Sequence, residues 1–378
     1  MGEALRNKRL LHLILIATVV VIIASCSDKL DMEEATHALL VGFDLDKENE
    51  FILYSTSPVF SKNVEKKTRE LRVKPQTNRQ SRGKQDSYTD GVFQGRSIQV
   101  LLVSKRILQQ ENWFQLTDVW FRDPKNPLTP RIIAFDGPLS EIIYLNPKDQ
   151  PMMPLLLREM VETKNARSET VKTTLQGLHQ QLREKGVTPI ISEVRMKDKQ
   201  IAMTGTTLLD HKGKFADSLN MQETTLLRIL KKNTKKSVNL TIPISGEMKI
   251  GPFHTDKLSL NADEIKVKIK TSFLKDKFQF DIHITMRVGL SELLFPYDVR
   301  SQGKELENKI TEQVQMQFEN LIKKIQTDKI DPIGLGLYAQ AHEYSHFKKV
   351  EDQWGETLAN ADIHVSVKTI IGAMGSVK

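Results

Sequence analysis

The feature that most constrains the fold is a strict alternation of apolar and polar residues in the C-terminal half of the chain, in segments 237–244, 264–273 and 278–288. From position 265 to position 270, isoleucine and valine take the odd positions and lysine takes the even ones. A period of two places the apolar side chains on one face of a strand. We therefore predict an antiparallel sheet with one face in water.

A long amphipathic helix is predicted soon after these strands, over residues 304–326. Apolar side chains recur there at helical spacing, and no glycine or proline interrupts the stretch. An apolar stripe of this kind must pack against another apolar surface, so we expect the helix to cover the dry face of the sheet. A last alternating strand is predicted at 362–369.

The N-terminal half is less regular but contains signals for both strands and helices. Short apolar runs predict a hairpin with arms at 38–43 and 51–54, a buried strand within 97–107 that runs into a turn or helix, and a further strand at 131–135. Apolar residues at helical spacing from Val171 to Leu182 predict a helix, with Ser168 as its N-cap and Gly186 at its end.

The length and the change of pattern suggest how the chain is divided. With 378 residues it can form two or three domains. The pattern changes near residues 195–200, which separates an N-terminal α+β region, 26–197, from a C-terminal α+β domain, 198–378. The N-terminal region can itself comprise two subdomains. The predicted fold class is α+β, with mixed and antiparallel sheets that are each covered by helices.

The segment 61–90 is polar and basic, and its first aromatic residue is Tyr88. We interpret it as a mobile excursion from the fold that can touch anionic lipid. Binding of nucleic acid is not expected, because the segment lacks aromatic platforms for bases and the formal net charge of the whole chain is only +8.

The first thirty residues have the pattern of an export signal. Basic residues precede an apolar run at 10–24, which is shorter than the roughly 20 residues needed to span a bilayer. The sequence from Ile23 to Cys26 resembles the lipobox of bacterial lipoproteins, so 1–25 would be a cleaved signal peptide. Cys26 would then carry S-diacylglycerol and N-palmitoyl groups, which together anchor a protein firmly. An uncleaved signal anchor is the alternative, and either one places the rest of the chain outside the cytoplasm.

Cys26 is the only cysteine in the sequence. This excludes an intramolecular disulfide and a thiolate metal cluster.

One motif points to catalysis. His342, Glu343 and His346 form an HExxH string, which on a helix places two zinc ligands on one face with a glutamate to activate water. A third ligand is needed, and Lys349 stands where the extended metzincin pattern requires glycine. Conceivable third ligands are Glu351, Glu356 and Asp362. The alternative interpretation is a surface helix with solvated histidines.

The three tryptophans, Trp113, Trp120 and Trp354, can either line a small-ligand pocket or belong to the core. The core is the more frequent place for tryptophan in a chain that is only 6% aromatic.

Taken in order, several segments are similar to those of the Ger(x)C family, the lipoprotein C subunits of nutrient germinant receptors in endospore-forming bacteria. They are the lipobox with Cys26, the strand 40–44, Gly95-Arg96 with the strand 101–107, the stretch 120–124, the segment 205–214 with the helix start 223–227, and the C-terminal series Asp331, Gly334, Trp354 and Gly372. The resemblance covers nearly the whole chain. Ser27 departs from it, because the family commonly has tryptophan after the lipidated cysteine.

The resemblance implies a non-enzymatic receptor subunit on the outer face of the spore's inner membrane. It would act together with an A-type and a B-type membrane subunit, and it would need no cofactor and no metal. Of the family's residues, only the lipidated cysteine carries over, as Cys26. Two alternatives stay open: a membrane-tethered zinc peptidase that uses His342, Glu343 and His346, and a lipid-anchored solute-binding protein with an interdomain cleft.

Overall fold

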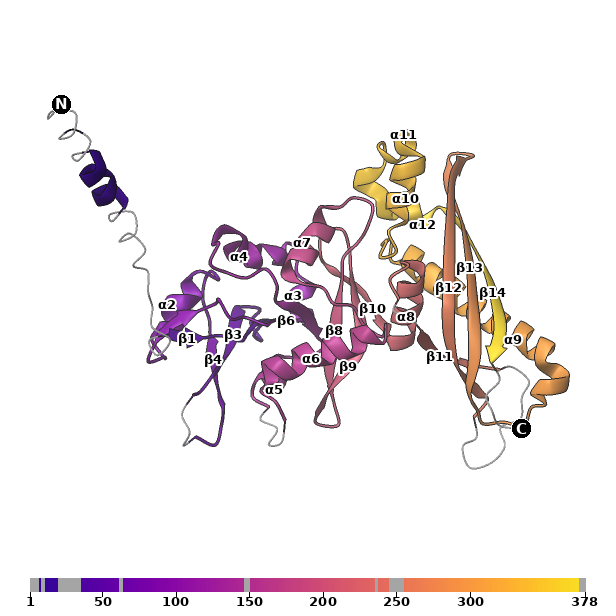
Figure 1. Cartoon of the computed structure of the whole chain (residues 1–378), viewed down its shortest axis with the longest axis horizontal. Helices are drawn as coiled ribbons and strands as arrows, with labels where there is room; N and C mark the ends of the chain where they lie inside the picture. Colours follow the sequence, from indigo (N-terminus) through magenta and orange to yellow (C-terminus); the bar gives the residue numbers. More distant parts are fainter. Residues whose placement is uncertain are drawn as a thin grey trace.

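The computed structural model describes residues 7, 11–19, 35–60, 64–145, 150–234, 237–244 and 255–373. Figure 1 shows an elongated molecule with one large sheet in its N-terminal part and a second sheet of long strands in its C-terminal part. The predicted α+β class with mixed sheets is confirmed. Within the described ranges, no helix combines the length and the apolar character needed to cross a bilayer.

The N-terminal sheet has eight strands in the order β10-β9-β8-β7-β6-β2-β3-β4. Its centre is parallel and consists of β2 (Leu40–Leu45), β6 (Val100–Ser104), β7 (Arg131–Phe135) and β8 (Ile190–Lys197). The flanking strands are antiparallel: β3 (Phe51–Pro58), β4 (Thr68–Val73), β9 (Gln200–Leu209) and β10 (Phe215–Asn220). Every residue of β6 is buried, as expected for a parallel strand covered on both faces.

Helices lie on both faces of this sheet. One face packs against α3 (Lys105–Leu108), η2 (Trp113–Thr117), α4 (Asp118–Arg122) and α7 (Leu175–Arg183). The other face packs against α5 (Ser140–Ile143) and α6 (Met153–Ala166). The two apolar clusters include Phe43 and Trp120 on the first side, and Phe135 and Leu157 on the second.

The C-terminal sheet has the order β11 (Val238–Pro243), β12 (Lys257–Leu274), β13 (Lys277–Leu293) and β14 (Asp362–Ala373). The first three strands are antiparallel, as predicted, but β14 pairs with β13 in parallel, so the sheet is mixed at that edge. The chain reaches β14 through a series of helices, and a connection of that length permits a parallel return.

The long helix α9 runs from Val299 to Thr327 and covers the dry face of the C-terminal sheet. A first turn, capped by the Asp298 carboxylate through the backbone N–H groups of Arg300 and Ser301, precedes a kink at Gln302 (φ −113°, ψ 17°). The main part of the helix follows this kink and starts close to the predicted residue 304. Its apolar stripe, which includes Leu306 and Phe318, is fully buried.

The helix α8 (Met221–Leu230) lies between the two sheets in Figure 1. Its Leu227 belongs to one apolar cluster that contains both Leu208 of the N-terminal sheet and Phe280 of the C-terminal sheet. The predicted boundary between 197 and 198 falls in the hairpin that joins β8 to β9, so the eight-stranded sheet takes strands from both sides of it. The two parts therefore share one apolar cluster, while the other two clusters in the described residues lie within the eight-stranded sheet and its helices.

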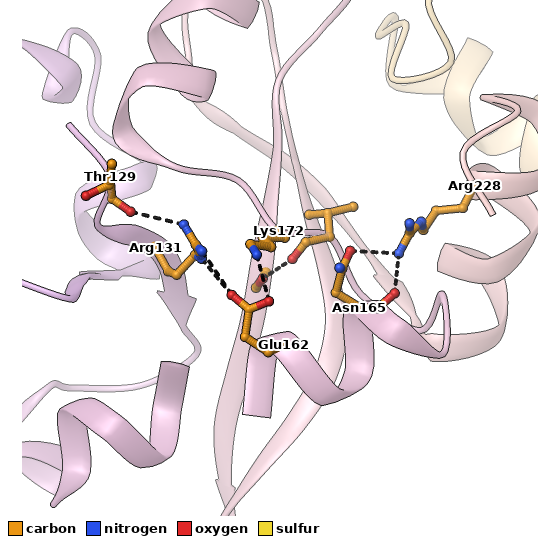
Figure 2. A network of polar contacts seen from close by, with 8 residues as sticks. Thr129, Arg131, Glu162, Asn165, Lys172 and Arg228 are labelled. Carbon is orange, nitrogen blue, oxygen red and sulfur yellow. Dashed lines mark hydrogen bonds and ion pairs between the residues drawn. The ribbon is translucent and has the colours of Figure 1, made fainter. Parts of the chain in front are cut away.

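Polar contacts strengthen the link between α6 and α8 (Figure 2). Arg228 of α8 is buried and donates to the backbone oxygen and the side-chain oxygen of Asn165, at 2.8 and 2.9 Å. In the same figure, the carboxylate of Glu162 in α6 accepts hydrogen bonds from the side chains of Arg131 in β7, at 2.9 Å, and of Lys172, at 2.7 Å.

The basic segment 61–90 is not an unstructured excursion where the structure describes it, from residue 64 onward. It contains the edge strand β4 and the helix α2 (Gln80–Asp86). Gln85 of α2 is buried and accepts a hydrogen bond from Ser55 of β3, while Asp86 accepts the backbone N–H of Phe93 at 2.7 Å. The anchors are polar, which explains why hydropathy gave no sign of them.

The remaining elements close the two ends of the fold. A short parallel pair joins β1 (Ala35–His37) to β5 (Val92–Gln94). Between α9 and β14 lie α10 (Leu335–His342), α11 (Tyr344–Phe347), η3 (Glu351–Gln353) and α12 (Trp354–Ala359).

Candidate functional site

A large open groove lies in the N-terminal part of the molecule, with a volume of about 1200 Å³. Its walls come from the β2–β3 turn, from α2 with the residues before it, from β5, and from the segment that holds η2 and α4. We call this feature the N-terminal groove. All its lining residues fall between Leu45 and Lys125, so it is not the interdomain cleft that a solute-binding protein of two lobes would have.

Two contacts hold the walls of the groove in place. Asn78, just before α2, donates its side-chain N–H to the backbone oxygen of Leu116 in η2, at 2.8 Å. On the other wall, Trp113 donates its indole N–H to the backbone oxygen of Gly213, at 2.6 Å. The groove therefore has walls that are preformed by contacts between distant parts of the sequence.

Charged side chains surround the groove. The basic ones are Arg79, Arg82, Arg96, Arg122 and Lys125, and the acidic ones are Glu111, Asp118 and Asp123. Arg79 and Arg82 lie against the same carboxylate oxygen of Asp123, at 3.4 and 3.5 Å. One carboxylate neutralises one guanidinium, so this trio has a net charge of +1. The nearby Asp86 carboxylate acts on Arg82 and offsets part of this charge.

The pKa values of the trio reflect this arrangement. The backbone N–H of Lys125 holds the pKa of Asp123 below its ordinary value; burial opposes this shift, and the two arginines add to it. Burial lowers the pKa of Arg82, and the neighbouring Arg79 lowers it further. An anion beside Arg82 would thus reduce the cost of keeping this guanidinium charged in the wall.

A small cavity of about 30 Å³ lies beneath the groove, and Asn78, Arg82 and Val119 line both spaces. Its other lining residues include Trp120 and Gln85, both buried. The indole nitrogen of Trp120 and the amide nitrogen of Gln85 have no hydrogen-bond partner within the described structure. Because buried N–H donors are normally paired, these two are suited to an oxygen acceptor.

The residues that line the groove determine the chemistry available there. Its described lining residues include no histidine, cysteine or serine, so the groove offers no nucleophile paired with an imidazole base. It offers instead cationic groups, N–H donors and an apolar floor that includes Phe51, Leu116 and Val119.

The HExxH string does not form the single helix that a zinc peptidase needs. The helix α10 ends at His342, and a new turn, α11, begins at Tyr344, because Glu343 has non-helical backbone angles of φ −132° and ψ 44°. The ring of His346 stacks on Phe273, with 3.9 Å between the ring centroids.

The conceivable third zinc ligands are engaged elsewhere or remote from such a site. Glu351 forms an ion pair with Lys348 at 2.6 Å, and Glu356 forms one with Lys329. Asp362 lies on β14, opposite Gln279 of β13. Among the residues that the structure describes, no group of three His, Cys, Asp or Glu side chains is arranged to hold a metal.

The other sequence-derived site residue, Cys26, lies outside the described residues, which resume at Ala35. The sequence does not reveal the groove, because the polar, basic composition around Arg79 and Arg82 is typical of a mobile segment. The tryptophans were a usable signal: all three are buried, as core residues are, and Trp113 also lines the groove.

Comparisons with known proteins agree over most of the chain. The family model described as "Spore germination protein N-terminal domain" matches residues 28–196, and the one described as "Spore germination B3/ GerAC like, C-terminal" matches residues 204–375. No curated protein matched the sequence. Among solved structures, the crystal structure of the GerBC protein is similar in fold, with a TM-score of 0.58 and 15% identity over 88% of this chain and 96% of that one. The chain therefore belongs to the Ger(x)C family of spore germination proteins.

Proposed function

We propose that this protein is the lipid-anchored, non-enzymatic C subunit of a nutrient germinant receptor, required for the germination response together with an A-type and a B-type membrane subunit. The observation that carries the proposal is the match of both family models, in order, over 28–196 and 204–375. Family membership supports a germinant receptor subunit and association with a membrane. The lipid anchor, the two partner subunits and the location on the outer face of the membrane go beyond what family membership supports, and they are part of the proposal.

The anchor is proposed at Cys26, as S-diacylglycerol with an N-palmitoyl group. The support is its sequence context, because small residues precede the cysteine and the apolar run before it is short for a spanning helix. Two acyl chains hold a protein at a bilayer far more firmly than one.

We expect the Cys26→Ala protein to incorporate no radiolabelled palmitate and to lose the nutrient response in spores. The matched control is Ser27→Ala, which keeps the thiol and should label and respond as the wild type does. Spores that carry Cys26→Ala and germinate normally would contradict the role of the lipid, whatever the labelling shows.

The partner assignment is tested by affinity capture of the tagged full chain from spore membranes, with identification of the captured proteins. Recovery of an A-type and a B-type subunit is the expected result. The non-enzymatic assignment predicts no turnover of peptides by the purified full chain, including after incubation with zinc. Turnover that is lost in a Glu343→Gln variant would instead favour the peptidase.

A further inference from the structure

We propose that the N-terminal groove binds an amphiphilic anion, that is, a carboxylate or phosphate group joined to an apolar body. The anionic group would lie between Arg79 and Arg82, and the apolar body would lie along the floor of the groove. This inference goes beyond the receptor assignment and does not depend on acylation at Cys26.

The arginine pair indicates where the anionic group would bind. Both guanidinium groups share a single oxygen of Asp123 at 3.4 and 3.5 Å, which is long for a charge-assisted hydrogen bond. Arg82 has one shorter contact, from Nη2 to the side-chain oxygen of Asn126 at 2.9 Å. An oxyanion between the two arginines would give both of them a planar, bidentate partner, for which guanidinium geometry is suited.

The buried donors beneath the arginines point to the same chemistry. Arg82 also lines the small cavity in which the Trp120 and Gln85 nitrogens lack partners. An oxygen acceptor that reaches this cavity, from the anion or through a bridging water, would satisfy donors that otherwise carry a desolvation cost. The arginine pair and the two unpartnered nitrogens therefore favour an oxygen-rich, negatively charged ligand at one end of the groove.

The apolar body follows from the floor. Phe51, Leu116 and Val119 are only partly buried and pack against the core from the groove side, and the fully buried Ile107 lies beside them. A ligand that covers this floor would bury apolar surface, at about 25 cal/mol for each Å². The volume of about 1200 Å³ exceeds the usual range of about 300–1,000 Å³ for small-molecule sites, so there is room for an extended apolar body.

Two sources can supply such an anion: a soluble organic acid, or the head group of an anionic lipid. The second source rests on the proposed function. The strand β5 lines the groove and pairs with β1, which begins at Ala35, nine residues after Cys26. Nine extended residues span at most about 30 Å, so an acylated Cys26 would keep the groove near the bilayer surface.

The test uses the full chain in phosphatidylcholine nanodiscs, which hold it by the acyl anchor or by the apolar run 10–24. Phenylacetate and phenyl phosphate are titrated by calorimetry against phenylacetamide, which has a similar ring but no charge. We expect saturable binding of the anions and at least tenfold weaker binding of the amide. Replacing a third of the lipid with phosphatidylglycerol weakens phenylacetate binding if lipid head groups occupy the groove, and leaves it unchanged if the ligand is soluble.

The variants separate binding from folding. Arg79→Gln should weaken anion binding about threefold and cannot disturb the fold much, because its side chain is 64% exposed and its one ion pair is with Asp123. The double variant Arg79→Gln, Arg82→Gln should weaken binding at least tenfold, with an unchanged circular dichroism spectrum as the folding check. The control Arg300→Gln, at the exposed start of α9, should bind as the wild type does.

The proposal is overturned if neither anion binds saturably, if phenylacetamide binds as well as phenylacetate, or if Arg79→Gln and the folded double variant keep wild-type affinity. A chain that is not acylated at Cys26 can still be tested for anion binding, since the apolar run 10–24 retains it in the disc. The two proposals can therefore fail separately.

Discussion

At the scale of single residues, buried polar groups explain positions that the sequence singled out only by resemblance. The carboxylate of Asp331 accepts the backbone N–H groups of Gly334 and Gly336 and the indole N–H of Trp354, at 2.8, 2.7 and 2.8 Å. Its backbone also exchanges hydrogen bonds with Thr188 from the N-terminal part. No periodicity reveals such a network, because its members are far apart in sequence and become neighbours only in the folded chain.

Replacing Asp331 by Asn should destabilise the protein by about 3 kcal/mol, because an amide group keeps only one oxygen for three donors and turns its own N–H₂ toward them. The free energy of unfolding from urea titration measures this loss. Asp352→Asn is the matched control, since the Asp352 side chain is 78% exposed and its ion pair is with Lys185 on the surface; it should change the free energy by less than about 0.5 kcal/mol. Equal stability of the two variants would show that the buried network adds little.

At the scale of elements, the sequence predicts helices and strands well where one apolar pattern is long and its side chains all pack into one apolar cluster. The strands β12 and β13 contain their predicted ranges but are longer, since β12 begins at Lys257 and β13 ends at Leu293. The main part of α9, after its kink at Gln302, lies close to the predicted range. The predicted helix after Ser168 instead begins at Leu175, where Thr174 accepts the backbone N–H of Gly177 as an N-cap. Val171, taken as part of that helix, packs into a different apolar cluster from Leu175. The helical spacing of Val171 and Leu175 in the sequence is therefore a coincidence, because the two side chains pack into two neighbouring apolar clusters.

The docking of α6 onto β7 predicts a pH dependence. Burial raises the pKa of Glu162, but hydrogen bonds from Lys172 and Arg131 outweigh it, so the net pKa is below the ordinary value. An acid with a lowered folded pKa contributes stability above its unfolded pKa of about 4.3, and that contribution is lost as the pH falls through the folded pKa. Glu162→Gln should cost about 1 kcal/mol at pH 7 and make the unfolding free energy fall less between about pH 5 and 3. Glu159→Gln, exposed on the same helix, should retain the wild-type slope; a wild-type slope in Glu162→Gln would refute the assignment.

At the scale of the whole molecule, the sequence predicted the fold class but not the order of the eight strands. The strand β2 pairs with β6, although β3, β4 and β5 lie between them in the sequence. The strands β8 and β9 belong to the same sheet, although α6 and α7 separate them from β7 in the sequence. Such pairings depend on which distant apolar runs meet, and no local pattern records this choice. The groove could not be predicted for the same reason, because its walls come from four separate segments between residues 45 and 125.

The shared core around α8 implies that the two parts unfold together, since Leu227 packs in one cluster with residues of both sheets. Leu227→Ala should cost about 3 kcal/mol through lost burial and a cavity. Hydrogen exchange followed by mass spectrometry should then show faster exchange by the same factor in β7 of the N-terminal sheet and β13 of the C-terminal sheet. Leu274→Ala, at a side chain 55% exposed in the β12–β13 hairpin, should leave both strands unchanged. If Leu227→Ala accelerates exchange in one sheet alone, the two parts are separate folding units.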